Sequence, residues 1–370
     1  MDYCKRCVLP STKPGLVIDA HGICSACRSV ERKHLIDWDA RADRLHRLAD
    51  QIRGSNGNGY ECIVPVSGGK DSCYQAYMMS KVYGLRTLAV VVVPHLQTVE
   101  GIENLNAMVS GLGVDLVKVS VRPSTLQKIR RIALLKIGNP NYAEHRVVFS
   151  AVARVASFYN APLVVWGEDI GVEFGGNVSA SSAEDGSADE LINNDLFREV
   201  GFEDLLGGKV PDNQLFFYQY PSREELARKK IKTIYLGYYH WWDGYKHYQI
   251  ARHFGFKPRQ AGPLSGNVLA YDNIDEKLCE IHIWFKFLKF GFWRPTDQCC
   301  YLIWNGYMER EEAVERVLAK QYEFPSEYLK EFLEYHQLSE EQFWASAERW
   351  RNADIWHRMG GQWRLRNEIA

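Results

Sequence analysis

The stretch from Glu61 to Ser72, ECIVPVSGGKDS, decides the fold that this chain is expected to adopt. The apolar residues Cys62 to Val66 predict a buried strand, and Cys73 to Tyr83 predict a helix. The turn between them, SGGKDS from Ser67 to Ser72, contains two adjacent glycines. Such a turn lets backbone N–H groups and the positive end of the helix dipole approach an anion closely. The stretch therefore predicts a phosphate site, to which Lys70 adds a mobile positive charge.

This turn is not a Walker loop, G-x-x-x-x-G-K-S/T, because Val64 stands where the first glycine would lie and Asp71 follows the lysine. It resembles the PP-loop, SGGxDS, of the N-type ATP pyrophosphatases, which cleave ATP between the α and β phosphates. The resemblance implies a parallel-sheet α/β domain of the HUP type, with Lys70 and Asp71 as catalytic residues. The alternative is a glycine turn that carries these residues by coincidence. The implied ATP-binding residues of the turn are Ser67, Gly68, Gly69, Lys70, Asp71 and Ser72.

Composition limits the classes of partner. At 370 residues the chain is long enough for one large domain with appendages or for two domains. Its net charge of -1 gives no basic field that would hold nucleic acid. No apolar run is long enough to span a bilayer and no secretory segment follows Met1, so we expect a cytoplasmic protein without membrane insertion. Its nine cysteines would be reduced there, which makes closely spaced pairs candidates for metal ligands.

Two C-x-x-C pairs near the N-terminus predict a metal site. Cys4 and Cys7 form the first pair, and Cys24 and Cys27 form the second. Four thiolates at this spacing satisfy tetrahedral Zn²⁺, and such a closed site is structural because no ligand position stays open. We therefore expect a zinc ribbon in residues 1–30. A pair of redox-active dithiols is the alternative.

Strand and helix patterns alternate after the glycine turn, which indicates a parallel sheet with helices on both faces. Strands are expected at 87–93, 114–119 and 162–166, and helices at 101–112, 124–136 and 144–159. The expected organisation is a ribbon at 1–30, a helical linker at 31–59, an ATP pyrophosphatase domain at 60–255 and a mainly helical region at 256–370. The linker is expected to contain one amphipathic helix from Val30 to Arg53, and the last region a long helix from Asp275 to Gly291.

A second group of polar residues follows the strand expected at 162–166. Ligands of a parallel sheet lie beyond the carboxyl ends of its strands, so Gly167 and Glu168 are expected to meet the same nucleotide. Asp169 and Glu173 add carboxylates for Mg²⁺ or for a substrate. A polar loop with Asp169 as a helix N-cap is the alternative. The small acidic segment at 176–190 is either a lid over ATP or a surface loop.

Several motifs in order resemble one family. The cysteine pairs and SGGKDS are followed by NPNYAEH (139–145), WGEDIGVEFGG (166–176), YDNIDEK (271–277) and KFGFWRPTD (289–297). This set resembles the N-acetyl sugar amidotransferases of bacterial surface-polysaccharide (lipopolysaccharide O-antigen) biosynthesis. The resemblance implies that ATP adenylates the acetamido oxygen of a nucleotide-linked N-acetyl sugar, and that ammonia then displaces AMP to leave an acetamidino group. ATP, Mg²⁺ and structural Zn²⁺ are the implied cofactors.

The substrate and the ammonia source lead to two further expectations. Lys246, Lys286 and Arg294 are candidates to receive the diphosphate of the sugar nucleotide, with solvated helix faces as the alternative. A separate glutaminase subunit is expected to supply ammonia. The first cysteine, Cys4, lies inside a metal pair, and the cysteines outside the ribbon lack the glycine-rich elbow of a triad glutaminase.

Two other classes of protein stay open. Some tRNA thiolation enzymes combine a PP-loop with zinc ribbons, but they usually need a basic RNA-binding face and further catalytic cysteines. This chain is nearly neutral and has no C-x-x-C after Cys27. The other class is a non-enzymatic subunit that uses ATP only to dock a glutaminase, against which the intact SGGKDS argues.

Overall fold

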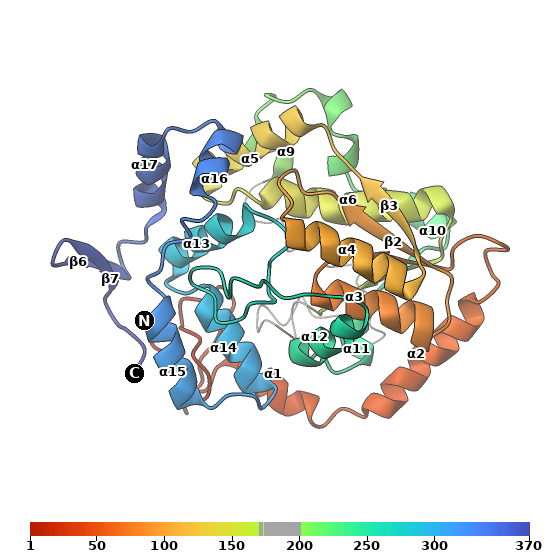
Figure 1. The fold of residues 1–370 in the computed structure, drawn as a ribbon, viewed down its shortest axis with the longest axis horizontal. Helices are drawn as coiled ribbons and strands as arrows, with labels where there is room; N and C mark the ends of the chain where they lie inside the picture. The colour runs from red at the N-terminus through yellow and green to blue at the C-terminus, as the bar shows by residue number, and fades with distance from the viewer. Residues whose placement is uncertain (170–172, 174–200) are drawn as a thin grey trace.

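A five-stranded parallel sheet forms the centre of the computed structural model, which describes residues 1–169, 173 and 201–370 (Figure 1). The strand order is β3-β2-β1-β4-β5, with β1 in the middle. This confirms the predicted parallel α/β fold. The strands are β1 (Cys62–Pro65), β2 (Thr87–Val92), β3 (Asp115–Val119), β4 (Leu163–Trp166) and β5 (Lys232–Tyr235).

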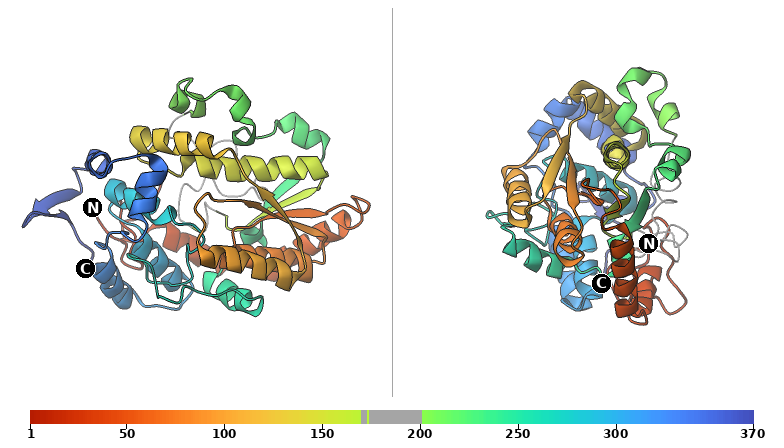
Figure 2. Two further views of the ribbon diagram at one scale, coloured as in Figure 1. Left: turned by 45° about the horizontal axis from the view of Figure 1, so that its top comes forward. Right: turned by 90° about the vertical axis from the view of Figure 1, so that its right-hand side faces the viewer.

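The central strands are apolar along their whole length because both faces of the sheet are covered. All four residues of β1 are buried, as are the first three of β4. Helices pack on the two faces (Figure 2), α2, α3, α4 and α12 contributing to one apolar cluster and α5, α6 and α9 to the other. Their bounds are α2 (Trp38–Ile52), α3 (Lys70–Tyr77), α4 (Val99–Leu112), α5 (Pro123–Ile137), α6 (Tyr142–Tyr159), α9 (Phe202–Leu206) and α12 (Gly244–His253).

Shorter helical elements connect these layers, and a group of helices follows them towards the C-terminus. The helix α3 continues as a π-helical turn, η1 (Met78–Val82). The remaining elements are α1 (Ser25–Lys33), η3 (Asp212–Gln214), η4 (Phe216–Tyr218), α10 (Arg223–Arg228), α11 (Leu236–Tyr239), α13 (Cys279–Phe290), α14 (Arg294–Trp304), α15 (Arg310–Lys320), α16 (Leu329–His336) and α17 (Glu340–Trp350).

The single helix predicted from Val30 to Arg53 is wrong, because two helices occupy this stretch. The first, α1, ends at Lys33, and α2 starts after Asp37. The Asp37 carboxylate accepts a hydrogen bond from the backbone N–H of Ala40 (2.9 Å) and so caps α2. The cap residue lies among many other charged residues, which is why the apolar periodicity alone did not separate the two helices.

The long helix predicted from Asp275 is also shorter than expected, since α13 begins at Cys279. The residues before it are held by the loop that precedes α4. The N–H of Thr98 donates to the carbonyl of Asp275 (3.1 Å), and Gln97 and Glu276 form an antiparallel bridge. These contacts keep Asp275 and Glu276 out of the helix and place them beside the carboxyl end of the sheet.

A small hairpin near the C-terminus was not predicted. It consists of β6 (Trp356–Met359) and β7 (Gln362–Leu365), and it projects from the rest of the molecule (Figures 1 and 2). Gly360 and Gly361 join the strands with positive φ angles of 60° and 82°. Two glycines between short strands are a hairpin signal, so the sequence did contain the information.

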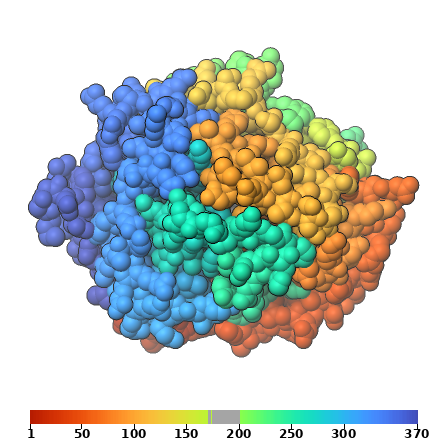
Figure 3. All heavy atoms as spheres, viewed as in Figure 1, coloured from red at the N-terminus to blue at the C-terminus, as the bar shows by residue number. Residues whose placement is uncertain are grey.

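The N-terminal cysteine ribbon packs against the C-terminal helices rather than standing apart. Its four paired cysteines share an apolar cluster with Phe292 and with residues of α14 and α15, including Cys300 and Ala313. The chain termini lie close together (Figure 1), and the Asn367 side chain donates to the carbonyl of Met1 (3.1 Å). On the face in Figure 3, the chain around residue 260, in blue-green, lies between the C-terminal helices, in blue, and the orange part of the chain that includes α4. Among the described residues, no helix combines the length and apolarity needed to cross a bilayer.

Candidate active site

A cavity of about 420 Å³ lies at the carboxyl end of the sheet, where the turn after β1 meets the end of β4. Ligands of open parallel sheets bind at this edge. Three groups of residues line the cavity. They are the glycine turn with the β4 end (Ser67, Gly69, Lys70, Asp71, Ser72, Gly167, Glu168), an apolar wall (Val90, Val92, Val148, Phe149, Val152, Trp166) and a polar edge (Asn141, Glu144, His145, Asp272, Asp275, Glu276, Cys279).

The turn after β1 has the conformation that its glycines predict. Gly68 has a φ of +97°, and a Cβ added there would lie 2.7 Å from the carbonyl oxygen of Gly101, so only glycine fits. Gly69 is the N-cap of α3. The Ser67 hydroxyl accepts from the Gly69 N–H (3.2 Å), and the Ser72 hydroxyl donates to the Gly69 carbonyl (3.0 Å). The turn thus places the start of α3, with its dipole and backbone donors, at the cavity.

Lys70 is held between two carboxylates inside the cavity. Its Nζ lies 2.7 Å from Asp71 Oδ2 and 2.5 Å from Asp272 Oδ1. Burial by itself lowers the pKa of Lys70, but the attraction of Asp272 and Asp71 outweighs burial and holds the pKa above its ordinary value. The ammonium group is therefore charged and fixed in direction before any ligand arrives.

His247 of α12 completes this group from the far side of Asp71. Its Nδ1 lies 2.7 Å from Asp71 Oδ1, while its Nε2 accepts a hydrogen bond from the backbone N–H of Asp243 (3.4 Å). Burial lowers the pKa of His247, which leaves the imidazole neutral with its proton on Nδ1. Its ring stacks on Tyr74, with centroids 3.9 Å apart. Lys70 and His247 together hold the pKa of Asp71 well below its ordinary value, although burial opposes them.

Sequence reasoning did not assign His247 or Asp272 to the site. Asp272 lies within the YDNIDEK motif and His247 within α12, but neither residue is near the turn in sequence. The motif was a signal for Asp272, whereas His247 lies in no motif of the set. Only the folded chain shows that they contact Lys70 and Asp71.

The two residues directly after β4 lie where the sequence predicts. A Cβ at Gly167 would lie 2.4 Å from the amide nitrogen of Gln75, which explains the glycine. Glu168 lines the cavity, and its pKa is raised first by burial and then by the charge of Asp71. Asp169 is buried, with 1% exposure, and it does not line the cavity. Glu173 pairs with Lys33 of α1 instead of facing the cavity.

The apolar wall of the cavity suits a flat aromatic ligand. Phe149 of α6 and Trp166 at the end of β4 have ring centroids 4.4 Å apart. Valines of β2 and α6 continue this surface. Ligand pockets typically combine such a wall with a few oriented polar groups, so a purine base can lie here while its phosphates reach the turn.

The polar edge of the cavity is organised by a fully buried arginine. Arg130 of α5 forms ion pairs with Glu144 and with Glu276 (3.3 Å), and it donates to the Asn141 side chain (2.7 Å). Burial and the charge of Glu144 raise the pKa of Glu276 to about 8, even though Arg130 opposes them. His145 lines the cavity beside them. Apart from Arg130, these residues belong to the NPNYAEH and YDNIDEK motifs, yet no role had been predicted for any of them.

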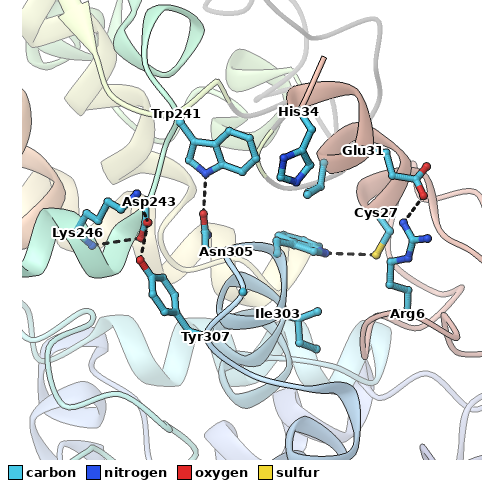
Figure 4. Close-up of a pocket in the computed structure, with 13 residues that line it drawn as sticks. Arg6, Cys27, Glu31, His34, Trp241, Asp243, Lys246, Ile303, Asn305 and Tyr307 are labelled. Atoms are coloured by element: carbon cyan, nitrogen blue, oxygen red, sulfur yellow. Dashed lines mark hydrogen bonds and ion pairs between the residues drawn. The ribbon is translucent and has the colours of Figure 1, made fainter. Parts of the chain in front are cut away.

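The three positive residues proposed for the substrate diphosphate do not meet at this cavity. Lys286 pairs with Asp297 (2.5 Å), and burial lowers its pKa to about 8. Arg294 lies 3.5 Å from Glu280. Lys246 lines a different pocket, shown in Figure 4, and lies 3.5 Å from Asp243.

That second pocket measures about 620 Å³ and lies between the ribbon, α12 and the end of α14. Aromatic residues including Trp241 and Tyr307 form much of it (Figure 4). Its lysine and its arginine are each neutralised, since Arg6 pairs with Glu31 and Lys246 with Asp243. The part of the lining that the structure describes therefore offers no surplus positive charge for a diphosphate.

The ribbon cysteines have the geometry of a metal site. All four sulfur atoms lie within 4.8 Å of one another, with 3.9 Å between Cys4 and Cys27 and 3.6 Å between Cys7 and Cys24. A tetrahedral ion with 2.3 Å metal–sulfur bonds requires sulfur–sulfur edges of about 3.8 Å. Backbone N–H groups and the Trp304 indole point at the sulfurs, for example Trp304 Nε1 at Cys27 Sγ (3.4 Å). These buried thiols fit a single structural metal ion.

Comparison with known proteins finds a match for the C-terminal part of the chain. The family profile described as "LPS biosynthesis protein WbpG-like, C-terminal domain" matches residues 235–369. This part of the chain is therefore similar to domains of lipopolysaccharide biosynthesis proteins. It contributes Asp272 and Glu276 to one side of the cavity, and His247 to the hydrogen bond with Asp71. No curated protein matches the chain in sequence.

Distant solved structures also align with parts of the chain. The NMN synthetase from Francisella tularensis is 15% identical, with 53% of this chain and 96% of that chain covered and a TM-score of 0.30. The NH3-dependent NAD synthetase from Campylobacter jejuni is 14% identical, covering 53% and 92%, with a TM-score of 0.30. The U34-tRNA thiolase from Methanococcus maripaludis, which holds a 4Fe-4S cluster, is 15% identical, covering 83% and 87%, with a TM-score of 0.33.

Proposed function

We propose that this chain is an ATP-dependent, AMP-forming amidotransferase. In the proposed reaction ATP adenylates the acetamido oxygen of a nucleotide-linked N-acetyl sugar, and ammonia then displaces AMP to give an acetamidino sugar with release of pyrophosphate. The observation that carries the proposal is the cavity itself. It joins the SGGKDS turn after β1 to Asp272 and His247 of the region similar to lipopolysaccharide biosynthesis domains.

The phosphate end of the cavity is built to stabilise a departing pyrophosphate. Negative charge grows on the β-phosphate oxygens as the bond to the α phosphorus breaks. We propose that the N–H groups at the start of α3 and the Lys70 ammonium, which Asp71 and Asp272 hold in place, meet this charge with little reorganisation during the reaction. Asp71 and Asp272 keep Lys70 oriented, and His247 keeps Asp71 oriented.

The charge of the cavity supports a requirement for Mg²⁺. Among the described residues that line the cavity, Lys70 is the only lysine or arginine and six are carboxylates, and ATP would add four negative charges. Carboxylate oxygens are the ligands that Mg²⁺ prefers. Asp71, Glu168 and Asp272 line the cavity and would hold the ion, whose contribution would be to neutralise the phosphates.

The acceptor sugar is proposed to meet the polar edge. Asn141, Glu144 and His145 present amide, carboxylate and imidazole groups to the cavity. Such groups hydrogen-bond sugar hydroxyls and an acetamido group. This placement replaces the three positive residues suggested by the sequence, because the structure does not bring Lys246, Lys286 and Arg294 to the cavity.

A metal ion and a partner protein complete the proposal. Zinc is the ion proposed for Cys4, Cys7, Cys24 and Cys27, since four thiolates at tetrahedral spacing suit it best. A separate glutaminase subunit is proposed as the ammonia source, because the chain carries no cysteine in the setting of a glutaminase nucleophile.

The test is to incubate the purified protein with ATP, Mg²⁺, ammonium and a panel of UDP-linked acetamido sugars. One sugar should stimulate AMP and pyrophosphate formation, and its product should be lighter by the mass difference between O and NH. Formation of ADP, or AMP formation that depends on tRNA and ignores every sugar, would contradict the proposal.

A further inference from the structure

A buried ion pair connects the cysteine ribbon to the loop after β4. Lys33 Nζ lies 2.8 Å and 2.9 Å from the two carboxylate oxygens of Glu173, and the side chains are only 5% and 6% exposed. Lys33 Nζ also lies 4.7 Å from the centre of the Trp241 ring. Burying two charges costs free energy that their attraction often only offsets, so such a pair is better evidence for fixed geometry than for stability.

On the ribbon side, the pair lies at the end of a helix that starts in the metal site. Cys24 caps α1, its sulfur accepting from the N–H of Cys27, and Lys33 is the last residue of the same helix. Nine helical residues span about 13 Å. The Trp38 indole donates to the carbonyl of Lys33 (3.0 Å), which fixes the far end of α1.

On the other side, Glu173 is joined to the residues that line the nucleotide cavity. Its N–H donates to the carbonyl of Asp169 (2.8 Å). The next residue towards β4 is Glu168, which lines the cavity, and the Gly167 carbonyl accepts from the N–H of Gly237 (2.9 Å). The carboxylate of Glu173 thus binds Lys33 at the end of α1, the helix that starts in the ribbon. The backbone of Glu173 supports the end of β4 that carries Glu168.

We propose that Lys33 and Glu173 are positioning residues through which the cysteine ribbon shapes the ATP site. Neither residue touches the cavity; they set the place of Glu168 and thereby the affinity for ATP. The inference rests on the proposed function, because it concerns the same nucleotide site. It gives the ribbon a part in nucleotide binding beyond holding the N-terminus on the C-terminal helices.

The test compares ATP binding by calorimetry in the wild type and in the double variant Lys33→Met with Glu173→Met. The double variant leaves no unpaired buried charge, so it avoids the instability that either single apolar substitution would cause. Its dissociation constant for ATP should rise about tenfold, by analogy with the lower end of the loss that removal of a supporting partner causes at metal sites. Metal content and melting temperature should stay close to wild type. Arg32→Met, which removes an exposed charge from the same helix, is the matched control.

Kinetics separate positioning from a general structural effect. In the double variant the KM for ATP should rise while the KM for ammonium stays unchanged. The single variant Lys33→Arg keeps the pair and should retain the ATP affinity of the wild type. Should the double variant fail to fold, Glu173→Gln keeps the shape and a hydrogen bond and should still weaken ATP binding severalfold. Wild-type ATP affinity in the double variant or in Glu173→Gln would overturn the inference. Absence of ATP binding in the wild type would overturn the proposed function as well.

Discussion

At the scale of single residues, Lys70 is the group on which the proposed chemistry depends most. Lys70→Ala removes the fixed positive charge that meets the departing pyrophosphate, and loss of one such donor typically lowers the rate about 10²- to 10³-fold. AMP formation measured at saturating ATP should show this loss, with an unchanged circular dichroism spectrum. Lys246→Ala, at a lysine that lines the other pocket, should keep the wild-type rate. Equal rates in the two variants would remove Lys70 from the mechanism.

A second residue-scale prediction concerns Glu276 and pH. Because burial and Glu144 raise its pKa from 4.5 to about 8, the folded protein binds a proton that the unfolded chain releases between these values. This residue therefore reduces stability as pH rises from about 4.5 to 8, by at most about 1.4 kcal/mol per pH unit. In urea unfolding, Glu276→Gln should lose less stability than wild type across this range. If the free energies of unfolding of wild type and Glu276→Gln changed in parallel with pH, the pKa of Glu276 would not be raised in the folded protein.

At the scale of the elements, the turn between β1 and α3 depends on Gly68. An alanine there would combine the strain of a positive φ with a Cβ only 2.7 Å from the Gly101 carbonyl. Gly68→Ala should therefore abolish measurable ATP binding and destabilise the fold by at least about 2 kcal/mol. Gly262 has a similar φ of +86° but open space around it, so Gly262→Ala isolates the strain alone and should keep ATP binding. Retained binding in Gly68→Ala would show that the turn can rearrange.

The elements also show what the sequence could and could not predict. The strands and the turn after β1 were predictable because apolar runs and paired glycines act locally. The break between α1 and α2 was missed because one capping aspartate lies among many charges. Neither Asp169 nor Glu173 lines the cavity. The sequence could not predict this, because a residue beside a strand end can face either the cavity or the ribbon. The lid expected at 176–190 lies outside the residues that the structure describes.

At the scale of the whole molecule, the site is assembled from segments far apart in the sequence, and the boundary expected at residue 255 separated Asp272 from Lys70, Asp71 and His247. Lys70 and Asp71 come from the turn after β1, whereas His247 comes from α12 and Asp272 from the segment before α13. Each residue type was visible in the sequence, but a contact across about 200 positions carries no local pattern. Motif order identified the segments that carry Lys70, Asp71 and Asp272 but not α12, and only the tertiary fold shows which side chains meet.

The ribbon contacts both the C-terminal helices and the helix that carries Lys33. We therefore expect loss of a metal bound to its cysteines to lower the stability of the whole molecule. The cysteines pack with residues of α14 and α15, and Cys24 begins the helix that carries Lys33. Cys24→Ser should lose the bound metal, measured by emission spectrometry, and lower the free energy of unfolding by about 3–5 kcal/mol. Cys73→Ser, at a buried cysteine outside the cluster, should keep its metal. A wild-type protein that is stable without any metal would contradict this prediction, because four buried thiols would then serve only as core residues.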